Sequence, residues 1–304
     1  MTDTSRRPGA DTPVAPGTSV IICSRGRPAL LTDAVTAVLR MTLLPAEVVV
    51  VDQSDEQNTA LAALVPESPV RVRYLWAPDR GLSRARNVGL AAASGDVLAF
   101  LDDDMLVAPD WLDACCRALA GVGARHVVTG RIPPGDPEVP GAWAPSTNTD
   151  AEPRAYSGRL RMDVFAPGNM AMPRSAYDDA GPFDERLGAG TVLPSAEDND
   201  YGYRLLRLGY TIDYRPEVVA VHRAWRDEGA YSGLRYDYGR GQGGFYAKHI
   251  TRGDVYMVRR FASDVYRHLR RSVRRARTDP VAARGDLAYT RGLLRGAIVW
   301  LRLR

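Results

Sequence analysis

The chain has 304 residues, and its 45% hydrophobic and 25% charged content is typical of a folded globular protein rather than a disordered one. Its apolar runs fall short of the ~18 residues that a membrane-spanning helix needs. Residues 1–17 lack the apolar core of a secretory signal and are expected to be disordered. Three cysteines provide no disulfide framework. The net charge of +4 is unevenly distributed, because residues 251–304 carry +10 and the remainder −6.

The first 130 residues alternate short apolar runs with stretches of helical periodicity. Runs that are apolar throughout predict strands buried on both faces, and the intervening stretches predict parallel crossovers. The expected strands are Val20–Cys23, Glu47–Val51, Val70–Leu75, Val97–Leu101 and His126–Thr129, and the expected helices are Ala29–Leu39, Leu82–Ala93 and Pro109–Leu119. The pattern therefore predicts an α/β fold with a mostly parallel sheet flanked by helices.

The rest of the chain has a different character. Residues 133–160 are rich in proline and predict a long loop, of the kind that serves as a lid or binding loop. Residues 160–225 are expected to contain short strands and a helix over Ser195–Leu208. We expect the remainder to be a linker followed by two basic helical stretches.

Polar side chains follow three of the expected strands. They form the segments Ser24-Arg25-Gly26-Arg27, Asp52-Gln53-Ser54-Asp55 and Asp102-Asp103-Asp104. In parallel α/β sheets, ligands bind beyond the carboxyl ends of the strands. The three clusters should therefore converge on one edge of the sheet.

Asp102-Asp103-Asp104 is the central chemical signal. Three consecutive carboxylates at the end of a buried strand repel one another unless a cation neutralises them. Alternation along an extended chain places Asp102 and Asp104 on one side, where they could hold Mg²⁺ or Mn²⁺. The alternative is a solvated acidic turn.

Three further signals each allow a structural reading. Glu197-Asp198-Asn199-Asp200 opens a helix, so its acids could serve the helix dipole behind a Ser195 N-cap, or could serve chemistry. His222 ends a strand and is either structural or a third metal ligand. The arginines of the segment 80–87 form either a phosphate site or a solvated basic face.

The order of these motifs resembles that of glycosyltransferase family 2. The resemblance covers about residues 18–225 and implies a GT-A fold of the inverting type, Rossmann-like. Besides the segments above, it rests on Ala85-Arg86-Asn87, Ser94-Gly95-Asp96, Gly168-Asn169-Met170-Ala171, Gly181-Pro182-Phe183-Asp184-Glu185 and Gly209-Tyr210.

The resemblance also implies a role for individual residues. Asp52 matches the residue that binds the nucleotide base, and Asp102 and Asp104 match the metal motif, with His222 as a possible further ligand. Asp103 is expected to face the ribose or phosphates. Nucleotide contacts are assigned to Ser24, Arg25, Asp52, Arg86, Asp102 and Asp103, and sugar contacts to Gly168, Asn169 and Trp225.

The chain departs from the family pattern at two positions of the expected base pocket. Many members have an aromatic residue and Asn where this chain has Arg25 and Gly26, and a second Asp where it has Gln53. UDP-sugar is the favoured donor, with dTDP and GDP as alternatives.

The acid pair Glu197-Asp198 matches the acceptor side of the family, with Asp198 as general base. We expect repulsion from Glu197, Asp200 and the metal-site acids to raise the pKa of Asp198. The implied reaction is metal-dependent transfer of a sugar to a hydroxyl of a sugar, lipid-linked or small-molecule acceptor, with inversion. Two other functions remain open: a nucleotidyltransferase that makes nucleotide-sugars, and a non-catalytic module that binds nucleotides or sugars.

The basic tail has amphipathic periodicity over 255–276 and a more apolar stretch over 287–303. It suits either an anionic membrane surface or packing on the body or a second subunit, whereas nucleic acid is not expected because no aromatic platform accompanies the arginines. The expected division is a catalytic domain over 18–225, with nucleotide-binding (18–131) and acceptor-binding (132–225) halves, and a helical extension over 226–304. The expected location is cytoplasmic, with the inner membrane face as a further option.

Overall fold

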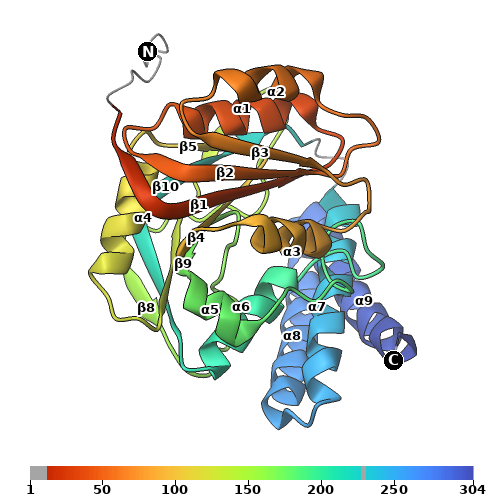
Figure 1. Ribbon diagram of the computed structural model, residues 1–304. Helices are drawn as coiled ribbons and strands as arrows, with labels where there is room; N and C mark the ends of the chain where they lie inside the picture. The colour runs from red at the N-terminus through yellow and green to blue at the C-terminus, as the bar shows by residue number, and fades with distance from the viewer. Residues whose placement is uncertain (1–11, 227–230, 304) are drawn as a thin grey trace.

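A ten-stranded mixed sheet organises the protein (Figure 1). The computed structural model describes residues 12–226 and 231–303. The strand order is β3-β2-β1-β4-β9-β6-β10-β5, and β7 and β8 also pair with β10. The strands are β1 Val14–Ser24, β2 Leu44–Asp52, β3 Arg71–Trp76, β4 Val97–Asp102, β5 Met105–Val107, β6 His126–Arg131, β7 Pro134–Pro137, β8 Arg154–Tyr156, β9 Asn169–Pro173 and β10 Thr211–Ala224.

Strands β3, β2, β1 and β4 run parallel, as the apolar runs predicted, and β9 is antiparallel to β4 and β6. The helices are α1 Pro28–Leu39, α2 Thr59–Leu64, α3 Leu82–Ala92, α4 Trp111–Ala120, α5 Arg174–Ala180, α6 Glu197–Arg207, α7 Tyr231–Ile250, α8 Val255–Arg275 and α9 Pro280–Arg302, with a 3-10 turn η1 over Val65–Glu67. Within the described residues, no helix has the length and apolar content needed to cross a bilayer.

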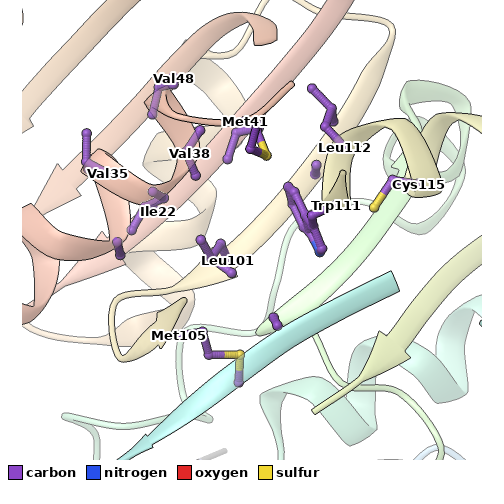
Figure 2. Close-up of a cluster of buried hydrophobic side chains, with 14 of the residues drawn as sticks. Ile22, Val35, Val38, Met41, Val48, Leu101, Met105, Trp111, Leu112 and Cys115 are labelled. Carbon is purple, nitrogen blue, oxygen red and sulfur yellow. The ribbon is translucent and has the colours of Figure 1, made fainter. Parts of the chain in front are cut away.

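Alternate residues of the central strands pack into two separate cores. Ile22, Val48 and Leu101 point toward α1 and α4, with Trp111 at the centre of this layer (Figure 2). Their neighbours along each strand, such as Phe100, face α3, α5 and α6 on the other side of the sheet. Burial on both faces explains why these strands are continuous apolar runs rather than alternating ones.

Helices α7, α8 and α9 form a layer beside α6, at the lower right of Figure 1. The backbones of α7 and α9 approach closely where glycines of one helix face carbonyls of the other. A Cβ on Gly243 would lie 2.0 Å from the Leu293 carbonyl oxygen, and a Cβ on Gly296 would lie 1.9 Å from that of Arg240. Only glycine permits this approach, which resembles the small-residue packing of helix pairs in general.

The expected linker before the basic helices is wrong, because α7 occupies residues 231–250. Each glycine of α7 makes helix formation less favourable by about 1 kcal/mol. The sequence therefore predicts a linker at these residues instead of a helix. Close packing against α9 compensates for that cost. Residues 227–230 lie outside the described part of the chain.

Three smaller expectations also need correction. Strand β1 begins at Val14, within the expected disordered lead-in, because Val14 and Ala15 pair with Leu44 and Pro45 before a bulge; residues 1–11 of that lead-in lie outside the described residues. The expected loop over 133–160 contains β7 and β8, which pair with β10. Ser195 is not the N-cap of α6, because its hydroxyl donates to carbonyls of α7 instead.

Candidate active site

A cleft of about 640 Å³ opens beside the carboxyl end of β4. Part of its lining is Asp102, Asp103 and Asp104, which we call the β4 end, and another part is the start of α6 with side chains of α7 and α9, which we call the α6 end. The strand register brings the carboxyl ends of β1, β2 and β4 together. Cys23 of β1 pairs with Asp102 of β4, and Ser24 of β1 pairs with Asp52 of β2. The polar clusters after β1, β2 and β4 therefore do converge on one sheet edge. The volume of the cleft lies within the range of small-molecule binding sites.

Arg27 partly neutralises the acidic run. Its guanidinium lies 2.6 Å from Asp103 Oδ1 and 2.9 Å from Asp104 Oδ2, and Ser24 Oγ donates to Asp103 Oδ2 at 2.5 Å. Burial raises the pKa of Asp103 to about 7, against the opposing effect of Arg27. Asp103 thus points toward Ser24 and Arg27, and Arg27 is a site residue that the sequence reasoning did not single out.

Asp104 lies next to His222 and Trp225. His222 Nε2 is 3.5 Å from Asp104 Oδ1, and Trp225 Nε1 donates to Oδ2 at 3.2 Å. Burial alone would raise the pKa of Asp104, but His222, Arg27 and Trp225 together lower it below its usual range. Strand pairing of His222 with Met105 holds the imidazole beside the acidic run.

These side chains could hold a divalent cation. Across residues 12–226 and 231–303, no three His, Cys, Asp or Glu side chains form a ready-made metal cluster. However, among the described residues Nδ1 of buried His222 has no hydrogen-bond partner and Nε2 has only the 3.5 Å contact with Asp104, an arrangement that proteins rarely leave unsatisfied. A carboxylate and an imidazole side by side, with Asp102 at the same end of the cleft, are a donor set that suits Mn²⁺ or Mg²⁺.

Arg86 of α3 joins the two ends of the cleft. Its guanidinium lies 3.2 Å from Asp102 Oδ1 and 2.9 Å from Glu197 Oε1, and the side chain is only 3% exposed. Gly168 permits the position of Asp102, because a Cβ there would lie 2.4 Å from Asp102 Oδ2. The arginine therefore stabilises both carboxylates and fixes the distance between strand β4 and helix α6.

Asp198 occupies the first turn of α6 at the other end of the cleft. Burial, followed by the charge of Glu197, raises the pKa of Asp198 to about 8, although the Asn199 N–H and Arg86 oppose the shift. Asp200 is not among the main causes of this shift; it is fully buried, and Lys248 and His249 contact its carboxylate. The predicted direction holds in the structure, but burial is the main cause.

The backbone that enters α6 is strained. Ala196 is the N-cap and has a left-handed conformation with φ 66° and ψ 15°. Such a conformation costs a non-glycine residue roughly 1–3 kcal/mol and is frequent at functional sites. Here it directs Glu197 toward Arg86 and places Asp198 in the cleft.

Some predicted residues lie away from the cleft. The amide of Asn169 is fully buried, accepts from Trp111 Nε1 at 2.7 Å and donates to the carbonyls of Arg131 and Val218 at 3.0 Å. It therefore holds strands together instead of facing a sugar.

Asp52 is also buried and outside the cleft lining, where it accepts from the amide and hydroxyl of Ser54 and from Tyr74 Oη. Arg25 and Ser24 likewise do not line the cleft. Trp225 does not line the cleft either, but its Nε1 donates to Asp104, which does.

Helix α7 supplies residues that sequence reasoning missed. Gln242 Oε1 accepts from Asn199 Nδ2 at 2.6 Å, while Gln242 Nε2 donates to Asp163 Oδ2 at 2.9 Å. This chain of bonds anchors the residue next to Asp198. Because the glycines of α7 obscured the helix, no signal in the sequence indicated these contacts.

The chain is similar to known proteins in sequence and in fold. The family model Glycosyl transferase family 2 matches residues 19–181. Hyaluronan synthase of Pasteurella multocida is 27% identical over 241 residues, which are 68% of this chain and 24% of that protein. Validoxylamine A glucosyltransferase of Streptomyces hygroscopicus subsp. limoneus is 35% identical over 137 residues, covering 44% and 30% of the two chains. The chain thus spans less than a third of the length of these two relatives.

Solved structures share the fold at low identity. A mannosyltransferase from Pyrobaculum calidifontis in complex with GDP-Man and Mn²⁺ has a TM-score of 0.62 at 19% identity, over 97% of this chain and 89% of that one. S. aureus TarS in complex with UDP-GlcNAc has a TM-score of 0.59 at 17% identity, over 94% and 91%. The predicted α/β fold of GT-A type is confirmed, and the similarity extends over the C-terminal helices.

Proposed function

The chain belongs to glycosyl transferase family 2, and we propose that it transfers a sugar from a nucleotide-diphosphate-sugar to an acceptor hydroxyl, with Asp198 as general base. One observation carries the proposal. A carboxyl with a pKa raised to about 8 lies in the same cleft as the acidic end of β4, and Arg86 links the two. One end has groups for a diphosphate and the other a group that can accept a proton near neutral pH.

The donor is proposed to bind at the β4 end. Arg27 and Arg86 provide guanidinium groups for phosphate oxygens. A divalent cation held by Asp102, Asp104 and His222 would act as a Lewis acid that stabilises the charge on the leaving diphosphate. Mn²⁺ is present in the structures of the Pyrobaculum mannosyltransferase and of GalNAc-T7, which supports a metal in this role.

Asp52 is proposed to bind the base. The assignment rests on the match of Asp52 to the base-binding residue of family 2, since Asp52 is buried at the end of β2 and does not line the cleft. A UDP-sugar is the favoured donor, with dTDP- and GDP-sugars as alternatives.

Asp198 is proposed to take the proton of the acceptor hydroxyl as the hydroxyl attacks the anomeric carbon. Its raised pKa makes it a stronger base than an ordinary carboxylate, and Arg86 and Glu197 fix the start of α6. Attack from the face opposite the leaving group inverts the anomeric centre. The acceptor, a sugar, a lipid-linked sugar or a small molecule, is proposed to enter between α6 and α7, where Tyr238 and Gln242 line the cleft.

The proposal also covers domain organisation and location. The catalytic domain is placed over 18–225, and the extension over 226–304 contributes α7 to the cleft. The proposed location is the cytoplasm, with the inner face of the membrane as a further option.

The test is an assay for nucleotide release. The full-length protein is incubated with UDP-, dTDP- and GDP-sugars, Mn²⁺ and a panel of sugar and lipid-linked acceptors, and products are analysed by NMR. Acceptor-dependent release of one nucleotide, with inversion, is expected. Retention of configuration would overturn the stereochemical part, and absence of release with every donor and acceptor would contradict the function.

A further inference from the structure

Helix α8 buries polar side chains and exposes apolar ones. Its inward face contains Arg260, Asp264 and His268. Each has a partner inside the protein: Arg260 lies 2.8 Å from Asp163, Asp264 accepts from Tyr246 Oη at 2.9 Å, and His268 Nδ1 lies 2.7 Å from Asp286. The inward charges are therefore satisfied within the protein.

The outward face of α8 is an apolar stripe. Its members are three, four or eight residues apart, and these spacings place them on one side of the helix. They are Val255, Val258, Tyr266, Leu269 and Val273, and their exposed fractions are 69%, 46%, 65%, 42% and 78%. Side chains so apolar and so exposed in one row are expected to have a partner that covers them.

Helix α9 has the same arrangement. Leu287, Leu294, Ile298 and Leu301 form its outward stripe and are 39% to 55% exposed. On the opposite side of this helix, Tyr289 lines the cleft. The two helices are neighbours, since Ser272 Oγ of α8 donates to the Ala283 carbonyl at the start of α9 at 2.9 Å.

Arginines flank both stripes. On α8 they are Arg259, Arg267, Arg270, Arg271, Arg274 and Arg275, and on α9 they are Arg284, Arg291, Arg295 and Arg302, all exposed. The acidic residues within the two helices, Asp264 and Asp286, are both buried. Arg267 pairs with Asp264 and Arg275 pairs with Asp286. Because two aspartates face ten exposed arginines, the outward faces combine apolar rows with an excess of positive charge.

We propose that the outward faces of α8 and α9 bind the surface of an anionic lipid bilayer. The apolar stripes would enter the boundary between headgroups and acyl chains, and the arginines would contact lipid phosphates. This occupant fits better than a second copy of the chain, because a symmetric contact through the same faces would bring arginine rows against each other. It stands independently of the proposed transferase activity.

The test is co-sedimentation of the full-length protein with vesicles of phosphatidylcholine, with and without phosphatidylglycerol. Binding is expected with the anionic vesicles and should weaken with salt. Arg270→Gln and Arg291→Gln should each lower the partition coefficient about fivefold, which corresponds to ~1 kcal/mol per arginine near an anionic surface. The double variant Leu269→Gln/Leu294→Gln should lower it by about tenfold or more.

Ser263→Gln is the matched control, because Ser263 is exposed on α8 outside the stripe. Nucleotide binding and thermal unfolding of each variant should equal those of the wild type, which separates this test from that of the proposed function. No binding to anionic vesicles, or equal binding by wild type and stripe variants, would overturn the proposal. It would also be overturned if light scattering showed a dimer that the stripe variants dissociate.

Discussion

The two ends of the cleft contain the same kind of side chain in opposite electrostatic states. Asp104 has a lowered pKa because His222, Arg27 and Trp225 surround it with donors and positive charge. Asp198 has a pKa raised to about 8 because it is buried beside Glu197, with Arg86 as an incomplete counterbalance. The partners of a carboxylate, rather than its identity, therefore determine whether it suits a cation or a proton.

The largest expected effect is at the proton-accepting end. Asp198→Asn keeps the shape but removes the base, so kcat/KM should fall by about 10²–10⁴-fold, the usual contribution of general base catalysis. Nucleotide binding should be unchanged. Asp178→Asn, at an exposed position of α5, is the control. Full activity of Asp198→Asn would remove Asp198 from the mechanism.

Arg86→Gln should affect both ends together. It leaves Asp102 and Glu197 without their shared cation, and breaking a buried ion pair costs about 3–5 kcal/mol. We expect a value near the lower limit, because Asp102 is 36% exposed. Denaturant unfolding measures the loss. Arg84 lies on the same helix as Arg86 but forms an exposed ion pair with Glu185. Arg84→Gln should therefore lower the free energy of unfolding by no more than about 1 kcal/mol. Equal losses for the two variants would contradict the bridging role of Arg86.

The pH dependence of kcat/KM should report the state of Asp198. Its carboxyl must be deprotonated to act as base, and its pKa in the folded protein is about 8. Activity should therefore rise about tenfold per pH unit below pH 8 and level off above it. A profile that is already flat from pH 5 to pH 8 would contradict the assignment.

Gln242→Met should have the smallest effect. It removes the bonds to Asn199 and Asp163 but retains the size of the side chain. We expect kcat to fall by about tenfold or less through poorer positioning of Asp198, with an unchanged Kd for the nucleotide. Ser232→Ala, exposed on the same helix, provides the comparison. A larger loss of nucleotide binding than of kcat would place Gln242 at the donor end instead.

The sequence could predict the acidic residues of the cleft better than their neighbours. Asp102–Asp104 follow a strand whose apolar run is uninterrupted. In α/β sheets generally, ligands bind beyond the carboxyl ends of such strands. Asn169 was assigned to a sugar because its motif does not reveal that Trp111, from a distant helix, occupies its amide oxygen. Gln242 was missed because the glycines of α7 do not indicate a helix until α9 is known to pack closely against them.

Calorimetric titration of UDP, with Mn²⁺ or with EDTA, tests most directly whether one end of the cleft binds metal and nucleotide while the other accepts the proton. It compares the wild type, Asp104→Ala and Asp198→Asn. We predict Mn²⁺-dependent binding that is lost in Asp104→Ala and retained in Asp198→Asn. Equal binding by Asp104→Ala and the wild type, or equal loss in the two variants, would contradict it.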